Sequence, residues 1–143
     1  MIRAIIFDFY DVIHFGTLQS WLANYRLERR GEVAEIFDLV DKNQISRVEF
    51  YQRLATLAGI SASEAQKTFE VEGTWNWPLI KVIHDLKKNY KLGLLSNADG
   101  QYLRDLLAQQ RLDQLFEAVI ASSEVGLVKP EAEIFKLILN ELN

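Results

Sequence analysis

The pattern of apolar and polar positions divides the chain into short apolar runs and longer amphipathic segments. Three runs rich in Ile, Leu, Val and Phe have the length of a strand that crosses a sheet once. These predicted strands are residues 2–9, 90–95 and 118–121. Because the first run is almost continuously apolar, it is predicted to be a fully buried strand.

Apolar residues at i, i+3 and i+4 spacing predict helices between and after these strands. The helical patterns cover residues 18–69, 79–86, 102–110 and 131–142. Within the first segment, Gly59 is predicted to end one helix and Ser61 to cap the next. The segment GTWNWP, residues 73–78, breaks the pattern and is predicted to be a linker.

Residues 41–46 begin like a calcium-binding loop, but the sequence lacks the glycine and the later oxygen ligands that such a loop needs. A turn between two helices is therefore predicted there. The order of elements is strand, helical insert, helix, strand, helix, strand, helix. Strands that alternate with helices in this way predict an α/β fold with a parallel sheet and right-handed crossovers.

Composition narrows the classes of protein that this sequence fits. The chain has 143 residues, of which 49% are hydrophobic and 25% charged, as is usual for a globular protein. Its net charge of −4 argues against a nucleic-acid partner bound through a basic face. No stretch approaches the roughly 20 apolar residues that cross a bilayer, so we expect no membrane partner and a cytoplasmic location. The absence of cysteine excludes disulfides and thiolate catalysis.

Polar residues with catalytic chemistry lie where the predicted strands end. Asp8 comes at the end of the first strand, Ser96 and Asn97 follow the second, and Ser122 follows the third. Ligands of such sheets bind at the carboxyl ends of the strands. With the cation Lys129 from the following loop, these residues suit covalent catalysis on an anion. A carboxylate attacks, while the hydroxyl, amide and ammonium groups stabilise the transferring group.

Three sequence motifs resemble those of one known family. FDFYDVI, LLSNA and SSEVGLVKPEAEIF occur in this order at the three strand ends. They resemble the first three motifs of the haloacid dehalogenase-like (HAD) hydrolase superfamily, in its capped phosphatase and dehalogenase branch. The resemblance implies a Rossmann-like core of about three strands, residues 1–15 and 76–143, and a small helical cap inserted at residues 16–75.

The resemblance also implies a role for each site residue. Asp8 would be the nucleophile, Ser96 and Asn97 would bind the transferring group, and Lys129 would orient Asp8 and neutralise charge. In the phosphatase members, Mg²⁺ would be bound by Asp8 and by the backbone carbonyl of Tyr10. The implied reaction is hydrolysis of a small phosphomonoester through an aspartyl-phosphate intermediate.

Two residues of the first motif depart from the family pattern. Phosphatases of the family usually have a second Asp, the general acid and base, at the position of Tyr10. A tyrosine there is similar to the L-2-haloacid dehalogenases, whose halide leaves without a proton, so a halogenated substrate is the alternative. Asp11 occupies a position where the family nearly always has glycine. Aspartate tolerates unusual backbone geometry better than most residues, but its charge would disfavour an anionic substrate.

The sequence also lacks the family's fourth motif, an acidic pair on the strand after the last helix. From this we expect a member truncated before that motif, with an incomplete Mg²⁺ site. The first strand would then have an exposed edge, through which two copies of the chain could associate. A third interpretation is therefore a non-catalytic protein that acts by binding or assembly.

Overall fold

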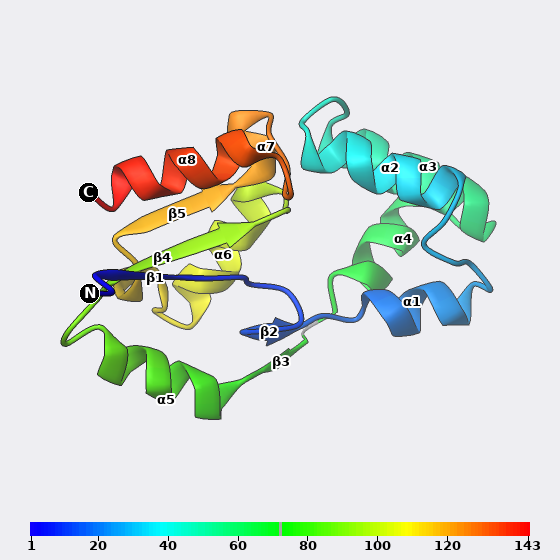
Figure 1. The fold of residues 1–143 in the computed structure, drawn as a ribbon. Helices are drawn as coiled ribbons and strands as arrows, with labels where there is room; N and C mark the ends of the chain where they lie inside the picture. The colour runs from blue at the N-terminus through cyan, green and yellow to red at the C-terminus, as the bar shows by residue number, and fades with distance from the viewer. Residues whose placement is uncertain (72) are drawn as a thin grey trace.

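The computed structural model describes residues 1–71 and 73–143 and has the predicted α/β architecture (Figure 1). Its main sheet is parallel, with the strand order β1-β4-β5. The strands are β1, Ala4–Phe7; β4, Lys91–Ser96; and β5, Ala118–Ala121. Ile5 of β1 pairs with Leu92 of β4, and Leu95 of β4 pairs with Ile120 of β5. The fold class and the three strands are therefore confirmed.

Helices cover both faces of this sheet, and each covered face has its own apolar cluster. Helix α8, Ala132–Glu141, lies on one face, and helices α5, Trp77–Leu86, and α6, Gly100–Gln109, lie on the other (Figure 1). The cluster under α8 consists of Leu95, Ala118, Ile120, Ile134, Ile138 and Leu142. On the opposite face, the cluster includes Phe9, Ile13, Ile80, Ile83, Leu92, Leu94, Leu103 and Leu107.

The prediction that the first strand is fully buried is wrong. All residues of β1 are only partly buried, whereas five of the six residues of the central strand β4 are buried. The reason is the position of β1 at the edge of the sheet, where β4 is its one partner among the described residues. This edge carries the unpaired backbone groups that strand pairing uses. Association of two copies through it remains a prediction.

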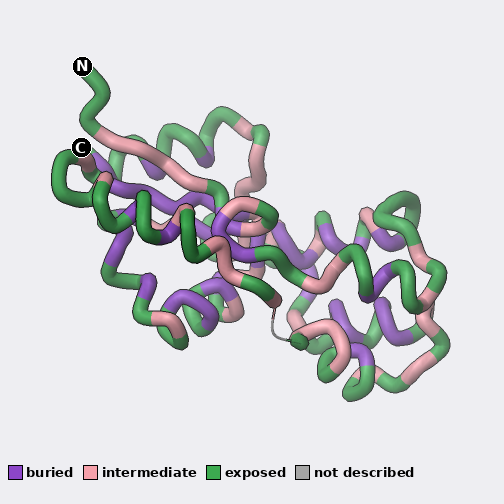
Figure 2. The backbone as a smooth tube through the Cα atoms, turned by 90° about the horizontal axis from the view of Figure 1, so that it is seen from below, coloured by how far each residue is buried: buried purple, intermediate pink, exposed green. Residues whose placement is uncertain are grey.

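Residues 18–69 form the helical insert, a separate group of helices beside the sheet (Figure 1). The helices are α1, Leu18–Asn24; α2, Glu32–Asp41; α3, Arg47–Ala58; and α4, Ala62–Phe69. Their buried side chains form a third apolar cluster. Figure 2 shows the buried positions of these helices apart from those of the strands. As predicted, Gly59 ends α3 in a left-handed conformation, and the Ser61 hydroxyl caps α4 by accepting from the Glu64 N–H.

A short antiparallel ribbon connects the sheet to the helical insert, where the sequence predicted only a loop and a linker. Strand β2, His14–Phe15, pairs with β3, Thr74–Trp75. Two residues per strand are too few to give a period-2 pattern, so this pairing had no sequence signal. The backbone of Gly73 passes so close to β2 that a Cβ there would lie 2.3 Å from the Phe15 carbonyl oxygen. The ribbon therefore requires a residue without a side chain at position 73.

Two short helices complete the chain, and the start of α6 differs from its predicted boundary. Helix α6 begins before its predicted start because the Asp99 carboxylate accepts from the Tyr102 N–H and caps it. The sequence analysis did not predict the 3₁₀-helix η1, Asp113–Leu115, or the one-turn helix α7, Ser122–Val125. The longest described helix, α3, has 12 residues, and none of the described helices could cross a membrane.

Replacing Gly73 with alanine should destabilise the fold by about 1 to 3 kcal/mol, because the new methyl group overlaps the β2 backbone and the His14 ring. Urea unfolding of Gly73→Ala measures this loss. Gly16→Ala is the matched control, since a Cβ at Gly16 meets no atom within 4 Å. Equal stability of the two variants would contradict the described packing of the ribbon.

Candidate active site

The carboxylate of Asp8 lies directly after β1, at the carboxyl edge of the sheet, and both of its oxygens have partners. Oδ1 accepts a hydrogen bond of 2.8 Å from the Phe9 backbone N–H. Oδ2 lies 2.7 Å from the Lys129 Nζ, which makes an ion pair between the first strand and the loop before α8. The Asp8 side chain is still 46% exposed, so the carboxylate is oriented and accessible at the same time.

Lys129 is held against Asp8 by contacts with the end of β4. Its Nζ also donates to the Leu95 carbonyl at 3.1 Å, and its backbone N–H donates to the Asn97 Oδ1 at 2.8 Å. The Asn97 Nδ2 donates back to the Lys129 carbonyl at 3.2 Å. The Asn97 side chain therefore positions the lysine loop, and its predicted contact with a substrate remains a prediction.

The hydroxyl of Ser96 is a buried polar group with an unused hydrogen-bonding capacity. The residue is 1% exposed, and its Oγ has no hydrogen-bond partner among the described residues. Leaving such a group unpaired costs about 1 to 3 kcal/mol, so a ligand that supplies the partner would relieve this cost. Ser122, the other serine at a strand end, is structural instead, because its Oγ accepts from the Ala98 N–H at 3.0 Å.

A cavity of about 370 Å³ lies between this edge of the sheet and the helical insert. Asp8, Ser96, Asn97 and Lys129 all line it, so the structure brings the predicted site residues together. The helical insert contributes an aromatic wall and two cations. These residues are Phe37, Phe50, Tyr51 and Phe69, with Arg29 and Arg47.

The two unusual residues of the first motif lie on the same cavity. Tyr10 packs edge-on against Phe9, with ring centroids 5.0 Å apart, while its side chain lines the cavity. Burial, and then the nearby groups of Tyr102 and Asp41, raises the pKa of Tyr10 far above its ordinary value, so the phenol stays neutral. Asp11 has a φ of 59°, the left-handed backbone that glycine adopts without strain. This is the unusual geometry that aspartate was expected to tolerate.

Comparisons with known proteins identify the family of this chain. The family of haloacid dehalogenase-like hydrolases matches residues 2–143. The chain belongs to this family. A curated relative, bifunctional epoxide hydrolase 2 from Rattus norvegicus, is 36% identical over 72 residues, which is 47% of this chain and 13% of that protein. Because only 13% of that relative is matched, its activity is not assigned to this HAD-like chain.

Solved structures share the fold of this HAD-like chain at low sequence identity. The HAD family enzyme bt-2542 from Bacteroides thetaiotaomicron has a TM-score of 0.80 at 19% identity, with 98% of this chain and 78% of that chain covered. A 2-haloacid dehalogenase from Pseudomonas syringae pv. Tomato DC3000 has a TM-score of 0.62 at 18% identity, with 99% and 73% covered. The bt-2542 enzyme has also been solved with magnesium and inorganic phosphate. The shared fold therefore does not separate phosphatase from dehalogenase activity.

The donors available to a metal ion in this HAD-like chain are hard oxygen atoms, the ligands that suit Mg²⁺. The described residues contain no group of three or more His, Asp or Glu side chains arranged to hold a metal. The predicted pair, the Asp8 carboxylate and the Tyr10 carbonyl, is nevertheless compatible with Mg²⁺. This ion is often held by one or two carboxylates together with substrate phosphate and water.

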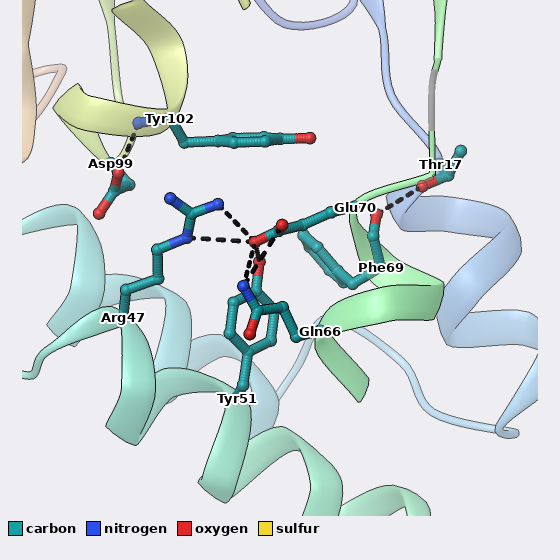
Figure 3. A network of polar contacts seen from close by, with 8 residues as sticks. All are labelled: Thr17, Arg47, Tyr51, Gln66, Phe69, Glu70, Asp99 and Tyr102. Carbon is teal, nitrogen blue, oxygen red and sulfur yellow. Dashed lines mark hydrogen bonds and ion pairs between the residues drawn. The ribbon is translucent and has the colours of Figure 1, made fainter. Parts of the chain in front are cut away.

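A network of polar contacts joins the helical insert to the sheet domain at the cavity (Figure 3). Its centre is the Glu70 carboxylate, which accepts from the Tyr51 hydroxyl at 2.6 Å and from the Arg47 guanidinium. The Arg47 guanidinium also lies over the ring of Tyr102 on α6, 4.9 Å from its centroid. Thr17 and Phe69, at the two ends of the helical insert, are linked by a hydrogen bond of 3.0 Å. The sequence analysis did not predict this network, because its members share no local pattern.

The sequence analysis also missed Asp41, which it placed only in a turn. This last residue of α2 is 8% exposed and lines the cavity. No hydrogen bond to its carboxyl group is found among the described residues. The pKa of Asp41 is raised to about 6, mainly by burial; Arg29 opposes this shift, and Asp38 and Asp99 add to it.

We expect the stability of the protein to fall as pH rises from about 4 to about 7, in part through Asp41. Because its folded pKa of about 6 exceeds the ordinary 3.8, the folded state keeps a proton that the unfolded state loses. Asp41→Asn removes this titration. The variant should match the wild type near pH 4 and be more stable at pH 7 by about 3 kcal/mol.

Urea unfolding at both pH values measures this difference in the free energy of unfolding. Glu35→Gln is the matched control, because Glu35 lies exposed on the same helix and outside the cavity. It should leave the pH dependence unchanged. An Asp41→Asn variant with a constant stability difference at both pH values would contradict the described burial of Asp41.

Proposed function

We propose that the chain hydrolyses a small phosphomonoester through an aspartyl-phosphate at Asp8. The observation that carries this proposal is the ion pair of 2.7 Å between Asp8 and Lys129, beside the unpartnered hydroxyl of Ser96. A phosphoryl group at this point would face a nucleophile, a cation and a hydroxyl donor. Family membership and the fold support a small-molecule hydrolase.

In the proposed first step, an oxygen of Asp8 attacks phosphorus, and the bond from phosphorus to the alcohol oxygen breaks. Lys129 neutralises charge on Asp8 and on the phosphoryl group, and the Ser96 hydroxyl donates to a phosphoryl oxygen. A water molecule then attacks phosphorus and releases phosphate and free Asp8. Mg²⁺, held by Asp8 and the Tyr10 carbonyl, would contribute positive charge beside the phosphoryl oxygens.

We further propose that residues 16–75 act as the cap that selects the substrate. This segment contributes a large part of the cavity wall, including the aromatic side chains of Phe37, Phe50, Tyr51 and Phe69. Arg29 lies over Phe37, 4.7 Å from its centroid, and Arg47 lies over Tyr102. We therefore expect a substrate with an apolar body, which would contact the aromatic side chains. Its phosphoryl group, at one end, would reach Asp8 and Lys129.

The dehalogenase alternative rests on Tyr10. The phenol lines the cavity where a phosphatase of the family usually has its acid, and a leaving halide needs no proton. In that reaction Asp8 would attack the carbon that carries the halogen. The third alternative, binding or assembly without catalysis, rests on the extra charge of Asp11 and the open edge of β1.

Replacing Asp8 with asparagine should abolish hydrolysis of p-nitrophenyl phosphate in the presence of Mg²⁺, because the amide is not a nucleophile. Lys129→Met should lower kcat by about 10² to 10³, the usual cost of losing one charge-stabilising group. The contacts of Lys129 with Asn97 use backbone atoms, so this variant keeps the loop in place. The assay measures release of p-nitrophenol.

Asp113→Asn is the control, because Asp113 is exposed and lies outside the cavity. Undiminished turnover by Asp8→Asn would overturn the proposal. Chloride release from L-2-chloropropionate without added metal, in place of phosphate release, would favour the dehalogenase. A wild-type protein that turns over neither substrate would favour the non-catalytic alternative.

A further inference from the structure

The proposed hydrolysis needs a proton donor, and position 10 does not supply one. When Asp8 attacks a phosphate ester of an ordinary alcohol, the departing oxygen has to be protonated as its bond to phosphorus breaks. Tyr10 lines the cavity, but its buried phenol is too weak an acid for this task near neutral pH. Another acid in the same cavity is therefore required.

Besides Asp8, three carboxyl groups line the cavity, and two of them do not suit this role. Asp99 caps α6, because its Oδ1 accepts from the Tyr102 N–H at 2.8 Å. Asp11, within the first motif, is exposed. Asp41 alone among the three is both buried and without a hydrogen-bond partner among the described residues.

Two contacts place the end of α2 beside the loop that carries Lys129. Helix α2 contacts α7, the one-turn helix that precedes the Lys129 loop, and the turn after α2 faces that part of the sheet domain (Figure 1). Lys42, the next residue after Asp41, forms an ion pair with Glu131, with 3.9 Å between the Lys42 Nζ and the Glu131 Oε1. Lys129 of the same loop touches Asp8, and Asp8 and Asp41 line the same cavity.

Two features of its position, the end of a helix and burial, favour the protonated form of Asp41. It is the last residue of α2, where the helix dipole disfavours negative charge. Burial disfavours the carboxylate as well. The charged and titratable groups that act on Asp41 from the surrounding elements are Arg29, Asp38, Asp99 and Tyr10.

We propose that Asp41 is the general acid and base of this site, an inference that rests on the phosphomonoester hydrolysis proposed above. In the first step, the Asp41 carboxyl gives its proton to the alcohol oxygen as the oxygen leaves phosphorus, and the carboxylate of Asp41 remains. In the second step, that carboxylate takes a proton from the water that attacks phosphorus, and Asp8 is released. Asp41 thus returns to its acid form, and the products are the alcohol and inorganic phosphate.

The test compares two substrates that differ in their need for an acid. β-Glycerol phosphate has a poor leaving group, whereas p-nitrophenolate leaves without a proton. Asp41→Asn should lower kcat/KM for β-glycerol phosphate by about 10² to 10⁴, and for p-nitrophenyl phosphate by less than about tenfold. With p-nitrophenyl phosphate the variant should also show a burst of p-nitrophenol, because breakdown of the aspartyl-phosphate then lacks its base.

Two controls accompany this comparison. Glu35→Gln, which changes an exposed acid on the same helix, should act like the wild type on both substrates. Circular dichroism checks that Asp41→Asn is folded, and Asp41→Ser provides a second variant without the carboxyl group. For the wild type, kcat/KM with β-glycerol phosphate should fall as pH rises through about 6, and this limb should be absent from Asp41→Asn.

The outcomes separate this inference from the proposed function. If the wild type hydrolyses both esters but the folded variants lose activity equally on both, or lose none, Asp41 is not the acid and the role of Asp8 stands. If the wild type hydrolyses neither ester, the proposed function fails, and the assignment of Asp41 fails with it. A selective loss on β-glycerol phosphate together with the burst supports the assignment.

Discussion

The ion pair between Asp8 and Lys129 is the interaction on which the arrangement of this site depends. It joins the end of β1 to a loop more than a hundred residues later, across the central strand β4. The loop reaches Asp8 because Asn97 and the Leu95 carbonyl, both from the end of β4, hold Lys129 in place. A half-exposed pair of this kind adds little stability by itself. The consequence of this pair is that the Asp8 carboxylate stays accessible while one of its oxygens contacts the Lys129 ammonium.

The sheet and the helical insert contribute different parts of the site. The sheet positions Asp8 and Lys129, since parallel strands bring their carboxyl ends to one edge. The helical insert supplies the opposite wall and is tied to α6 through Arg47, Glu70 and Tyr102. The buried carboxyl of Asp41 costs stability at neutral pH, and the proposed mechanism gives it a role as acid and base. Proteins often accept such a cost at functional sites.

The parts that the sequence predicted are those governed by local pattern. Three apolar runs and the polar residues behind them were enough to place Asp8, Ser96 and Lys129 at one edge of a parallel sheet. What the sequence could not predict depends on contacts between distant segments. The ribbon of His14–Phe15 and Thr74–Trp75 is too short for a periodic signal, and the burial of Asp41 exists only once α2 lies against the sheet domain. The burial of β1 was overestimated because an apolar run does not reveal whether its strand is central or at an edge.

The proposed hydrolysis depends on covalent phosphorylation of Asp8. The most direct measurement is rapid acid quenching during turnover of a phosphomonoester with Mg²⁺, followed by peptide mass spectrometry. We expect one added phosphoryl group on Asp8, in the peptide that contains this residue, and the loss of that group on treatment with hydroxylamine. Turnover that leaves every peptide unmodified, or that modifies a different residue, would contradict the account.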